Sequence, residues 1–394
     1  MDIVYKINQL VLNDAKNQLC LCYNNGIKTF SGEDFKLLYA SNPIGNISMA
    51  AIVHELNIVI FVGSESNEMY SNKKLVIYDL INKKDIYSTP FQNEIKSLKI
   101  INKFLIIGFD SELKIFSIEK KDTIIPIKEI SLPTTEFFVI WDKSSNEIIT
   151  LSKIFLAYFY EKQLHVKSFL GNEWNLDKND KIKSPVSKIQ NIFYIQKLNQ
   201  IIIPDETAYY IYGINPDDGK QTLCLYRGKY SGTITSIVLL NKNYLAVNNL
   251  NKTIHIFDIS ENSNSYSITN IIGGFIYGNY ISPIIRIPYD KLIKKNEGEF
   301  YESDFIRKGS ILVSDDDGIE LKVIAYNGVA YKIRFNFLKK TFEIVFSKKF
   351  AQYKRIDNEE EVGNDNENDL YSSYNSIFDN KKTTKKDGKF IVIK

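Results

Sequence analysis

One pattern recurs seven times along the 394-residue chain and restricts its fold more than any other feature. In each copy an apolar segment leads to a turn with Asn, Asp or Gly. A segment of alternating apolar and polar residues follows, with an aromatic residue near its end. Alternation with a period of two predicts β-strands, and most copies are about 40–50 residues apart, which is the spacing of propeller blades. The alternating segments are residues 26–30, 74–79, 112–116, 154–160, 208–212, 252–258 and 329–335.

These copies predict an all-β, seven-bladed β-propeller of the WD-repeat type over residues 1–350. A ring of blades leaves no long open sheet edge, which makes it a stable arrangement for so many short strands. A pair of β-sandwiches is the alternative, and the regular spacing disfavours it. We also expect residues 4–11 to join the last blade and close the ring. An insertion near residues 290–306 accounts for the longer gap before the last copy.

The composition changes near the C-terminal end. Residues 357–361 are acidic except for one Asn, and four lysines lie between residues 381 and 386. A segment with much charge and few apolar residues cannot bury a core of its own. We therefore expect residues 351–394 to form a charged, disordered tail.

Several classes of function are disfavoured by composition and motifs. The net charge of +3 is too small to indicate a nucleic-acid partner. The chain has neither a secretory signal at its start nor a run of about 18 apolar residues for a membrane span. Cys20 and Cys22 have no nearby histidine, so we expect small buried side chains in a reducing, cytosolic compartment. No nucleophile–base arrangement, metal-ligand spacing or Gly-rich phosphate loop is visible, which predicts a non-enzyme without cofactor or metal.

Several segments, taken in order, resemble the PROPPIN (WIPI) family of phosphoinositide-binding WD-repeat propellers. Residues 58–63 and 72–79 give the most distinctive match, to the family's second blade. The resemblance covers roughly residues 1–345, and this chain resembles a divergent member. It implies a protein without catalytic activity that binds phosphatidylinositol 3-phosphate or the 3,5-bisphosphate in autophagy or in endosomal and vacuolar traffic. The other matching segments are residues 25–30, 94–98, 112–116, 227–257, 285–288 and 331–335.

The family signature is Phe-Arg-Arg-Gly or Leu-Arg-Arg-Gly, in which each arginine serves a separate headgroup pocket. In this sequence Tyr226 takes the place of the first arginine, and Arg227 takes the place of the second. The resemblance also puts Ile182 where the first pocket would have its histidine, leaving Ser184 and Ser187 as donors. Because phosphate is bound best by a planar, permanently charged group, we expect the first pocket to be lost.

The second pocket is better kept. Arg227, Thr253 and His255 fall at the matching positions, while Asn248 and Asn249 replace serines of the family. An amide still offers an N–H donor, so the resemblance implies one weakened headgroup site formed by these five residues. Without the resemblance, a lone histidine in a strand would more often be structural. Two other arginines, Arg286 and Arg334, are expected to brace the ends of blades.

Family members also insert a loop of the sixth blade into the bilayer, and residues 260–280 correspond to it. Insertion gains from buried apolar area, and each cation near an anionic surface adds roughly 1 kcal/mol. No Lys or Arg lies between Lys252 and Arg286, so the loop supplies only the apolar part. Its expected membrane contacts are Ile268, Ile271, Ile272, Phe275 and Ile276.

Two functions follow as hypotheses. The first is a cytoplasmic protein bound peripherally to pre-autophagosomal, endosomal or vacuolar membranes. It would bind phosphoinositide-containing membranes weakly at one site and recruit autophagy or membrane-traffic proteins on its rim. The alternative is an interaction scaffold that has lost lipid binding and reaches membranes through a partner. The lost first pocket and the uncharged loop favour the alternative, whereas the kept second pocket favours the first.

Overall fold

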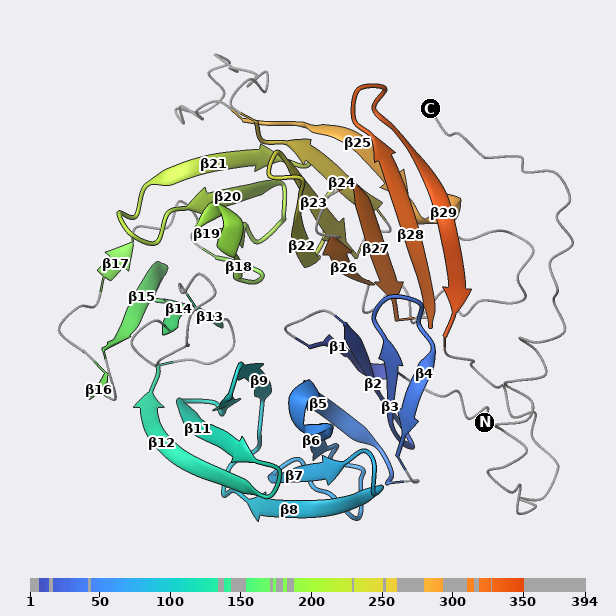
Figure 1. Ribbon diagram of the computed structural model, residues 1–394. Helices are drawn as coiled ribbons and strands as arrows, with labels where there is room; N and C mark the ends of the chain where they lie inside the picture. Colours follow the sequence, from blue (N-terminus) through green and yellow to red (C-terminus); the bar gives the residue numbers. More distant parts are fainter. Residues whose placement is uncertain are drawn as a thin grey trace, which may run out of the picture.

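The computed structural model shows seven antiparallel sheets arranged in a ring (Figure 1), which confirms the predicted all-β, seven-bladed propeller. Each sheet consists of strands that are consecutive in the sequence, and its first strand lies nearest the centre of the ring. The structure describes residues 7–13, 17–41, 44–133, 138–142, 154–170, 173–174, 180–182, 188–228, 230–250, 253–260, 280–292, 310–314, 319–326 and 328–350.

The first three blades each have four strands. Blade 1 contains β1 (Ile7–Leu12), β2 (Gln18–Tyr23), β3 (Gly26–Ser31) and β4 (Leu37–Ala40). Blade 2 contains β5 (Ile47–Val53), the 3-10 helix η1 (His54–Leu56), β6 (Ile58–Gly63), β7 (Lys74–Asp79) and β8 (Lys84–Pro90). Blade 3 contains β9 (Ser97–Ile101), β10 (Phe104–Gly108), β11 (Glu112–Lys120) and β12 (Thr123–Ser131).

The remaining four blades complete the ring. Blade 4 contains β13 (Phe138–Asp142), β14 (Ile154–Tyr160), β15 (Gln163–Leu170), β16 (Glu173–Trp174) and β17 (Asp180–Ile182). Blade 5 contains β18 (Phe193–Ile195), η3 (Gln196–Leu198), β19 (Gln200–Pro204), β20 (Tyr210–Ile214) and β21 (Gln221–Tyr226). Blade 6 contains β22 (Ile234–Leu240), β23 (Tyr244–Asn249), β24 (Thr253–Asp258), β25 (Pro283–Pro288) and η4 (Tyr289–Lys291). Blade 7 contains β26 (Ser310–Ser314), β27 (Glu320–Ala325), β28 (Val329–Asn336) and β29 (Thr341–Lys349).

The recurring sequence pattern falls mainly on one position of the blade. Six of the seven copies lie on the third strand: β3, β7, β11, β20, β24 and β28. The copy at residues 154–160 instead forms β14, the second strand of blade 4. The third strand there is β15, so the pattern located the blade correctly but was one strand out of place.

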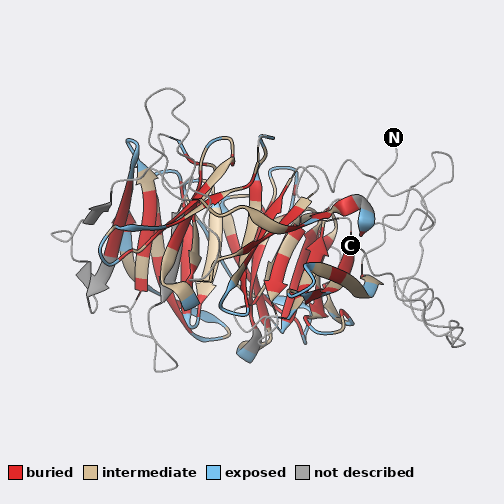
Figure 2. Ribbon diagram, turned by 90° about the horizontal axis from the view of Figure 1, so that it is seen from above, coloured by how far each residue is buried: buried red, intermediate tan, exposed pale blue. Residues whose placement is uncertain are grey.

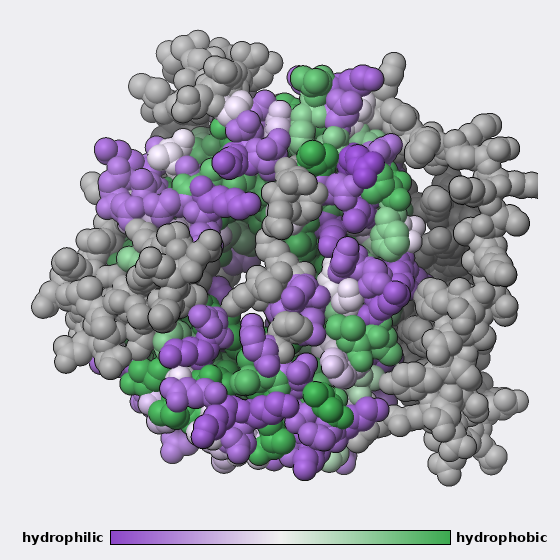
Figure 3. All heavy atoms as spheres, in the orientation of Figure 1, coloured by the Kyte–Doolittle hydropathy of each residue, from purple (hydrophilic) through white to green (hydrophobic). Residues whose placement is uncertain are grey.

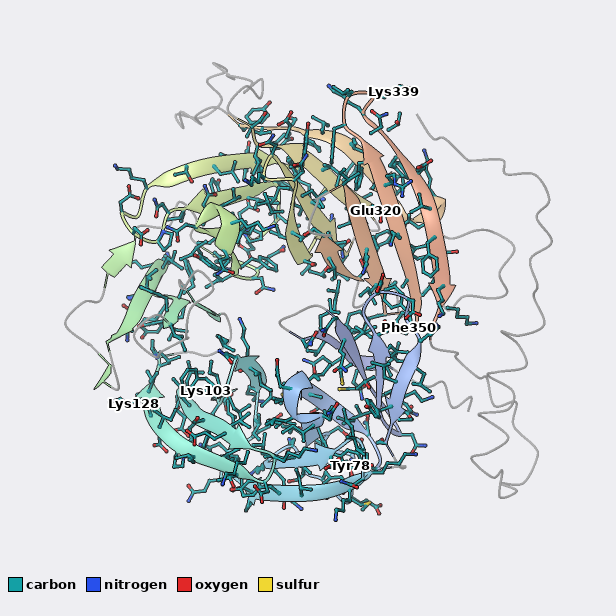
Figure 4. The ribbon with its side chains drawn as sticks, viewed as in Figure 1. Tyr78, Lys103, Lys128, Glu320, Lys339 and Phe350 are labelled. Atoms are coloured by element: carbon teal, nitrogen blue, oxygen red, sulfur yellow. The ribbon has the colours of Figure 1, made fainter. Side chains whose placement is uncertain are left out.

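The expectation that the first strand completes the last blade is wrong. Strand β1 pairs with β2 and is the innermost strand of blade 1. Side chains close the ring instead, because Phe350 packs against Phe30 and Phe35 with ring centroids 5.4 Å and 5.9 Å apart (Figure 4). Lys322 of blade 7 also donates to the carbonyl oxygen of Gly32 in blade 1, at 2.9 Å.

The hydrophobic core lies between blades. Seven clusters of buried side chains each combine residues of two neighbouring blades, and together they cover all seven junctions of the ring. The middle strands are covered on both faces, which explains why every residue of β6 is buried and apolar or glycine. The outer strand β8 is partly exposed and therefore more polar. In the side view the buried residues follow the strands (Figure 2). Cys20 and Cys22 of β2 are both buried in the junction of blades 1 and 2.

The proposed tail, residues 351–394, lies outside the described residues, as does most of the insertion expected at residues 290–306. The domain boundary at residue 350 therefore stays a prediction, placed just after the end of β29. None of the helices in the described ranges is long and apolar enough to span a bilayer. Within those ranges there is also no group of three or more His, Cys, Asp or Glu side chains that could hold a metal ion.

Candidate functional site

The segment that resembles the family signature is fixed at the junction of blades 5 and 6. The backbone N–H of Tyr226 donates to the carbonyl oxygen of Ile281, and the N–H of Ile281 donates to Cys224, both at 2.9 Å. The N–H of Arg227 donates to the carbonyl oxygen of Tyr209 at 2.8 Å. The end of β21 is thus bonded to the chain entering β25 and to the loop before β20. These backbone bonds set the position from which the Arg227 side chain starts.

An aromatic cluster takes the place of the first signature arginine. The ring of Tyr226 lies 5.2 Å from that of Tyr210 and 5.1 Å from that of Tyr280, measured between centroids. Such tilted and edge-on ring pairs are favourable, and they offer hydroxyl groups but no cation. Ile182 ends β17, where its backbone pairs with Leu164. Ser184 and Ser187 lie outside the described residues.

Arg227 is buried, with only 4% of its surface exposed. Its Nε donates to the carbonyl oxygen of Ala208 at 2.7 Å, and its Nη2 donates to the carbonyl oxygen of Tyr230. The side chain therefore joins the loop before β20 to the turn after β21. Burial lowers the pKa of Arg227, and the carboxylate of Asp205 acts in the opposite direction. Since the arginine side chain is not deprotonated in proteins, the guanidinium keeps its charge.

His255 and Thr253 lie two residues apart on β24 and so share one face of the strand. Nε2 of His255 lies 3.1 Å from Oγ1 of Thr253, within hydrogen-bonding distance. Nδ1 of His255 is buried and has no hydrogen-bond partner in the described part of the chain. Burial first, and then the charges of Arg227 and Arg286, together lower the pKa of His255 to about 3. The imidazole is therefore neutral near pH 7, with one N–H to donate.

Arg286 is the member of this cluster that the site prediction omitted. On β25 it is the direct cross-strand partner of His255, so both side chains leave the same face of blade 6. It is exposed, and within the described residues it forms no hydrogen bond or ion pair. A Cβ built on Gly228 would lie 3.9 Å from Arg286 Nη2, which places the guanidinium next to the residue after Arg227. Gly228 has φ +132°, a conformation that favours glycine.

The two arginines expected to brace blade ends behave differently. Arg334 does so, because its Nη2 lies 2.6 Å from Glu320 Oε1 and its Nη1 lies 3.7 Å from Glu343 Oε1. Glu320 stands on β27 of the same blade (Figure 4). No such partner holds Arg286 among the described residues, so the structure does not support a bracing role for it.

The two asparagines of the predicted pocket are enclosed. Asn248 is fully buried, and its Nδ2 donates to Thr235 Oγ1 at 2.7 Å and to the Ser310 carbonyl oxygen at 2.9 Å. Its Oδ1 accepts a hydrogen bond from the hydroxyl group of Tyr289. Since Ser310 begins blade 7, this network joins blades 6 and 7. The amide of Asn248 is thereby engaged within the protein.

Asn249 is also fully buried, and its side chain packs against the backbone of Gly232. A Cβ on Gly232 would lie 2.3 Å from Asn249 Oδ1, so the two segments approach as closely as a glycine allows. Of the five predicted headgroup residues, the structure thus brings Arg227, Thr253 and His255 together and adds Arg286. The predicted membrane contacts, Ile268, Ile271, Ile272, Phe275 and Ile276, lie outside the described residues.

Comparison with known proteins supports the fold. No protein-family model matches the sequence. Among solved structures, Hsv2 of Kluyveromyces marxianus is similar with a TM-score of 0.63 and 13% identity, and Kluyveromyces lactis Hsv2 with a complete loop 6CD has 0.62 and 14%. A complex of KlAtg21 with the coiled-coil of AgAtg16 has 0.61 and 13%. Each match covers 88% of this chain and 100% of the other. The resemblance to this family was expected over roughly residues 1–345, and the chain has the seven-bladed propeller fold of the PROPPIN members Hsv2 and Atg21.

Proposed function

We propose that the protein is a non-enzymatic, peripheral membrane propeller that binds a phosphoinositide headgroup at the junction of blades 5 and 6. Phosphatidylinositol 3-phosphate is the first candidate, and the 3,5-bisphosphate is the second. The observation that carries the proposal is the convergence of Arg227, Thr253 and His255, which match the second pocket of the PROPPIN family, at one junction. The proposed location is the cytoplasmic side of pre-autophagosomal, endosomal or vacuolar membranes.

The charge at this junction suits a phosphate monoester, which carries about −1.5 to −2 at pH 7. Two arginines lie close enough to His255 to lower its pKa. The nearby Asp205 is hydrogen-bonded by the hydroxyl group of Thr207 at 3.0 Å and by the N–H of Tyr209 at 2.9 Å. The carboxylate of Asp205 acts on Arg227 and offsets part of the charge of the two arginines, and a bound phosphate would balance the remaining positive charge. Thr253 and neutral His255 add donors of the kind that supports such a contact.

A scaffold without lipid binding is the second candidate. The aromatic cluster around Tyr226 and the enclosed side chain of Arg227 favour it, because both reduce what the site offers to a phosphate. The KlAtg21 structure contains the coiled-coil of AgAtg16, so a propeller of this fold can carry a coiled-coil partner. Autophagy or membrane-traffic proteins on the rim are the proposed partners in either case. In the view along the ring axis, hydrophilic and hydrophobic residues are mixed over the blades (Figure 3).

Liposome flotation separates the two functions. The full chain is mixed with vesicles of phosphatidylcholine alone and with vesicles that also contain phosphatidylinositol 3-phosphate, the 3,5-bisphosphate or phosphatidylserine at matched charge. We expect flotation with phosphatidylinositol 3-phosphate above that with phosphatidylserine, and Thr253→Val should reduce it. Flotation no greater than with phosphatidylcholine would rule out lipid recognition. The scaffold function would then remain, and membrane recruitment in cells should depend on a protein partner.

A further inference from the structure

The signature arginine has little left to offer a ligand. Arg227 is 4% exposed, and both groups on one edge of its guanidinium, Nε and Nη2, already donate to backbone carbonyl oxygens. Bidentate binding of phosphate needs two parallel N–H donors on an accessible edge. In Arg227 one such edge is taken, and the other belongs to a buried side chain. Arg227 keeps its positive charge, but most of its N–H donors are used within the protein.

Arg286 has the opposite properties. It is exposed, and none of its N–H groups is engaged by another described residue. It stands directly across from His255, and its Nη2 lies next to the backbone of Gly228. An arginine whose donors are engaged by no other described residue, beside a second cation, is the arrangement to which a planar phosphate contact is suited.

The electrostatics of the site point the same way. Each arginine lowers the pKa of His255, and Arg286 also lowers that of Arg227, so the three groups lie within reach of one another. Asp205 and Tyr209 are the acidic groups that act on Arg227, and neither is in a salt bridge with it among the described residues. Like charges held this close repel, and an anion between them would convert that repulsion into attraction.

His255 gives an independent indication of a ligand. Its side chain is 5% exposed, yet Nδ1 has no hydrogen-bond partner among the described residues. Buried polar atoms are nearly always satisfied, and an exception at a cationic cluster is consistent with a group that arrives from outside. The cross-strand position of Arg286 places this nitrogen and the free guanidinium on one face of blade 6.

We propose that Arg286 makes the direct contact with the phosphate in this site. Arg227 holds the surrounding loops and attracts the phosphate through its buried charge, without contacting it. The inference rests on the proposed function, since it names the residue through which the same site would bind an inositol phosphate. The phosphate-binding cation would then come from the outer strand of blade 6 and not from the signature segment itself.

The test compares Arg286→Gln with Arg334→Gln, a control that removes the same charge from an exposed arginine of blade 7. Binding of inositol 1,3-bisphosphate and of inorganic phosphate is measured by titration calorimetry, and binding to vesicles with phosphatidylinositol 3-phosphate by flotation. A lost charge-assisted contact predicts about tenfold or greater weakening for Arg286→Gln with each of these ligands. Arg334→Gln should bind like the unchanged protein, and Arg286→Lys should recover part of the affinity.

The outcomes separate the inference from the function on which it rests. If the unchanged protein binds the vesicles and Arg286→Gln binds them equally well, the inference is wrong and the proposed function stands. If Arg286→Gln weakens vesicle binding but not inositol 1,3-bisphosphate binding, Arg286 acts on the bilayer surface and the inference is again wrong. If the unchanged protein binds no vesicles, the proposed function fails. Tighter binding of inositol 1,3-bisphosphate than of inorganic phosphate would identify the lipid headgroup as the source of the phosphate.

Discussion

The Nη2 group of Arg227 donates to the backbone carbonyl oxygen of Tyr230. A buried arginine therefore holds the backbone of a residue whose own side chain is 83% exposed. The same guanidinium reaches Ala208 through Nε at 2.7 Å. One side chain therefore connects two loops at the junction of blades 5 and 6. The arginine that a family signature would assign to ligand binding also has a structural role in this protein.

Replacing Arg227 should consequently lower stability. Arg227→Met keeps most of the aliphatic stem but leaves the carbonyl oxygens of Ala208 and Tyr230 without their donor. Each hydrogen bond from a charged group contributes about 1.5–3 kcal/mol, and relief of the repulsion from Arg286 offsets part of the loss. We expect the free energy of unfolding in urea to fall by about 1–3 kcal/mol. Arg286→Gln should change it by less than about 0.5 kcal/mol. Equal stability of both variants and the unchanged protein would contradict the structural role.

Asn248 should be the most sensitive polar residue at the junction of blades 6 and 7. Asn248→Ala removes one of the partners of the Tyr289 hydroxyl group, which keeps Ser310 Oγ at 3.0 Å, and it removes the amide donor to Thr235 and Ser310. Unsatisfied buried groups cost about 1–3 kcal/mol each, so we expect a loss of about 2–4 kcal/mol in urea unfolding. Thr235→Val, which removes only one of these partners, should cost less. A variant at position 248 as stable as the unchanged protein would show that the network contributes nothing.

Much of the fold could be predicted because the pattern within a blade is local. Alternation and turn residues identify strands such as β7 and β24 without knowledge of the neighbouring strands. The place of β1 could not be predicted in this way, because an apolar first strand fits the last blade as well as the first. Both asparagines of β23 are buried for a related reason. Adjacent residues point to opposite faces, and only the structure shows that both faces of this middle strand are covered.

The site was predictable where spacing within one strand decides it, as for Thr253 and His255. The position of Arg286 opposite His255 depends on the register between β24 and β25, which a long connection separates in sequence. The hydrophobic pattern decides which face each side chain occupies, but without a short turn it does not decide which residue stands opposite His255. The direction of the Arg227 side chain, toward two carbonyl oxygens, depends on loops of blade 5 in the same way. Contacts between elements, and not the residue types, were the missing information.

His255 should make stability depend on pH. Its pKa is about 3 in the folded protein, against 6.5 for an ordinary histidine, so the unfolded chain binds more protons between these values. The stabilising contribution of neutral His255 is therefore fully present above pH 6.5. As the pH decreases through this window the free energy of unfolding falls, by about 2 kcal/mol at pH 5 from this group alone. His255→Gln has no group that titrates there. Urea unfolding at pH 7 and pH 5 should show a smaller decrease for the variant, and an identical decrease would contradict the prediction.

The last prediction concerns Tyr230, which stands beside the proposed site with its side chain in solvent. If this junction faces the bilayer as proposed, the ring suits the interface, where an apolar body and a polar hydroxyl group are both accommodated. Tyr230→Ala should weaken binding to vesicles with phosphatidylinositol 3-phosphate about three- to tenfold, since apolar burial of a ring contributes on the order of 1 kcal/mol in this setting. Binding of inositol 1,3-bisphosphate should not change, because the Tyr230 contact with Arg227 is made by the backbone. Tyr230→Trp should retain vesicle binding.

The control is Met69→Ala, which removes a 63% exposed apolar side chain in the loop between β6 and β7, across the ring in Figure 1. An equal loss of vesicle binding in both variants would show that Tyr230 has no special place at the membrane.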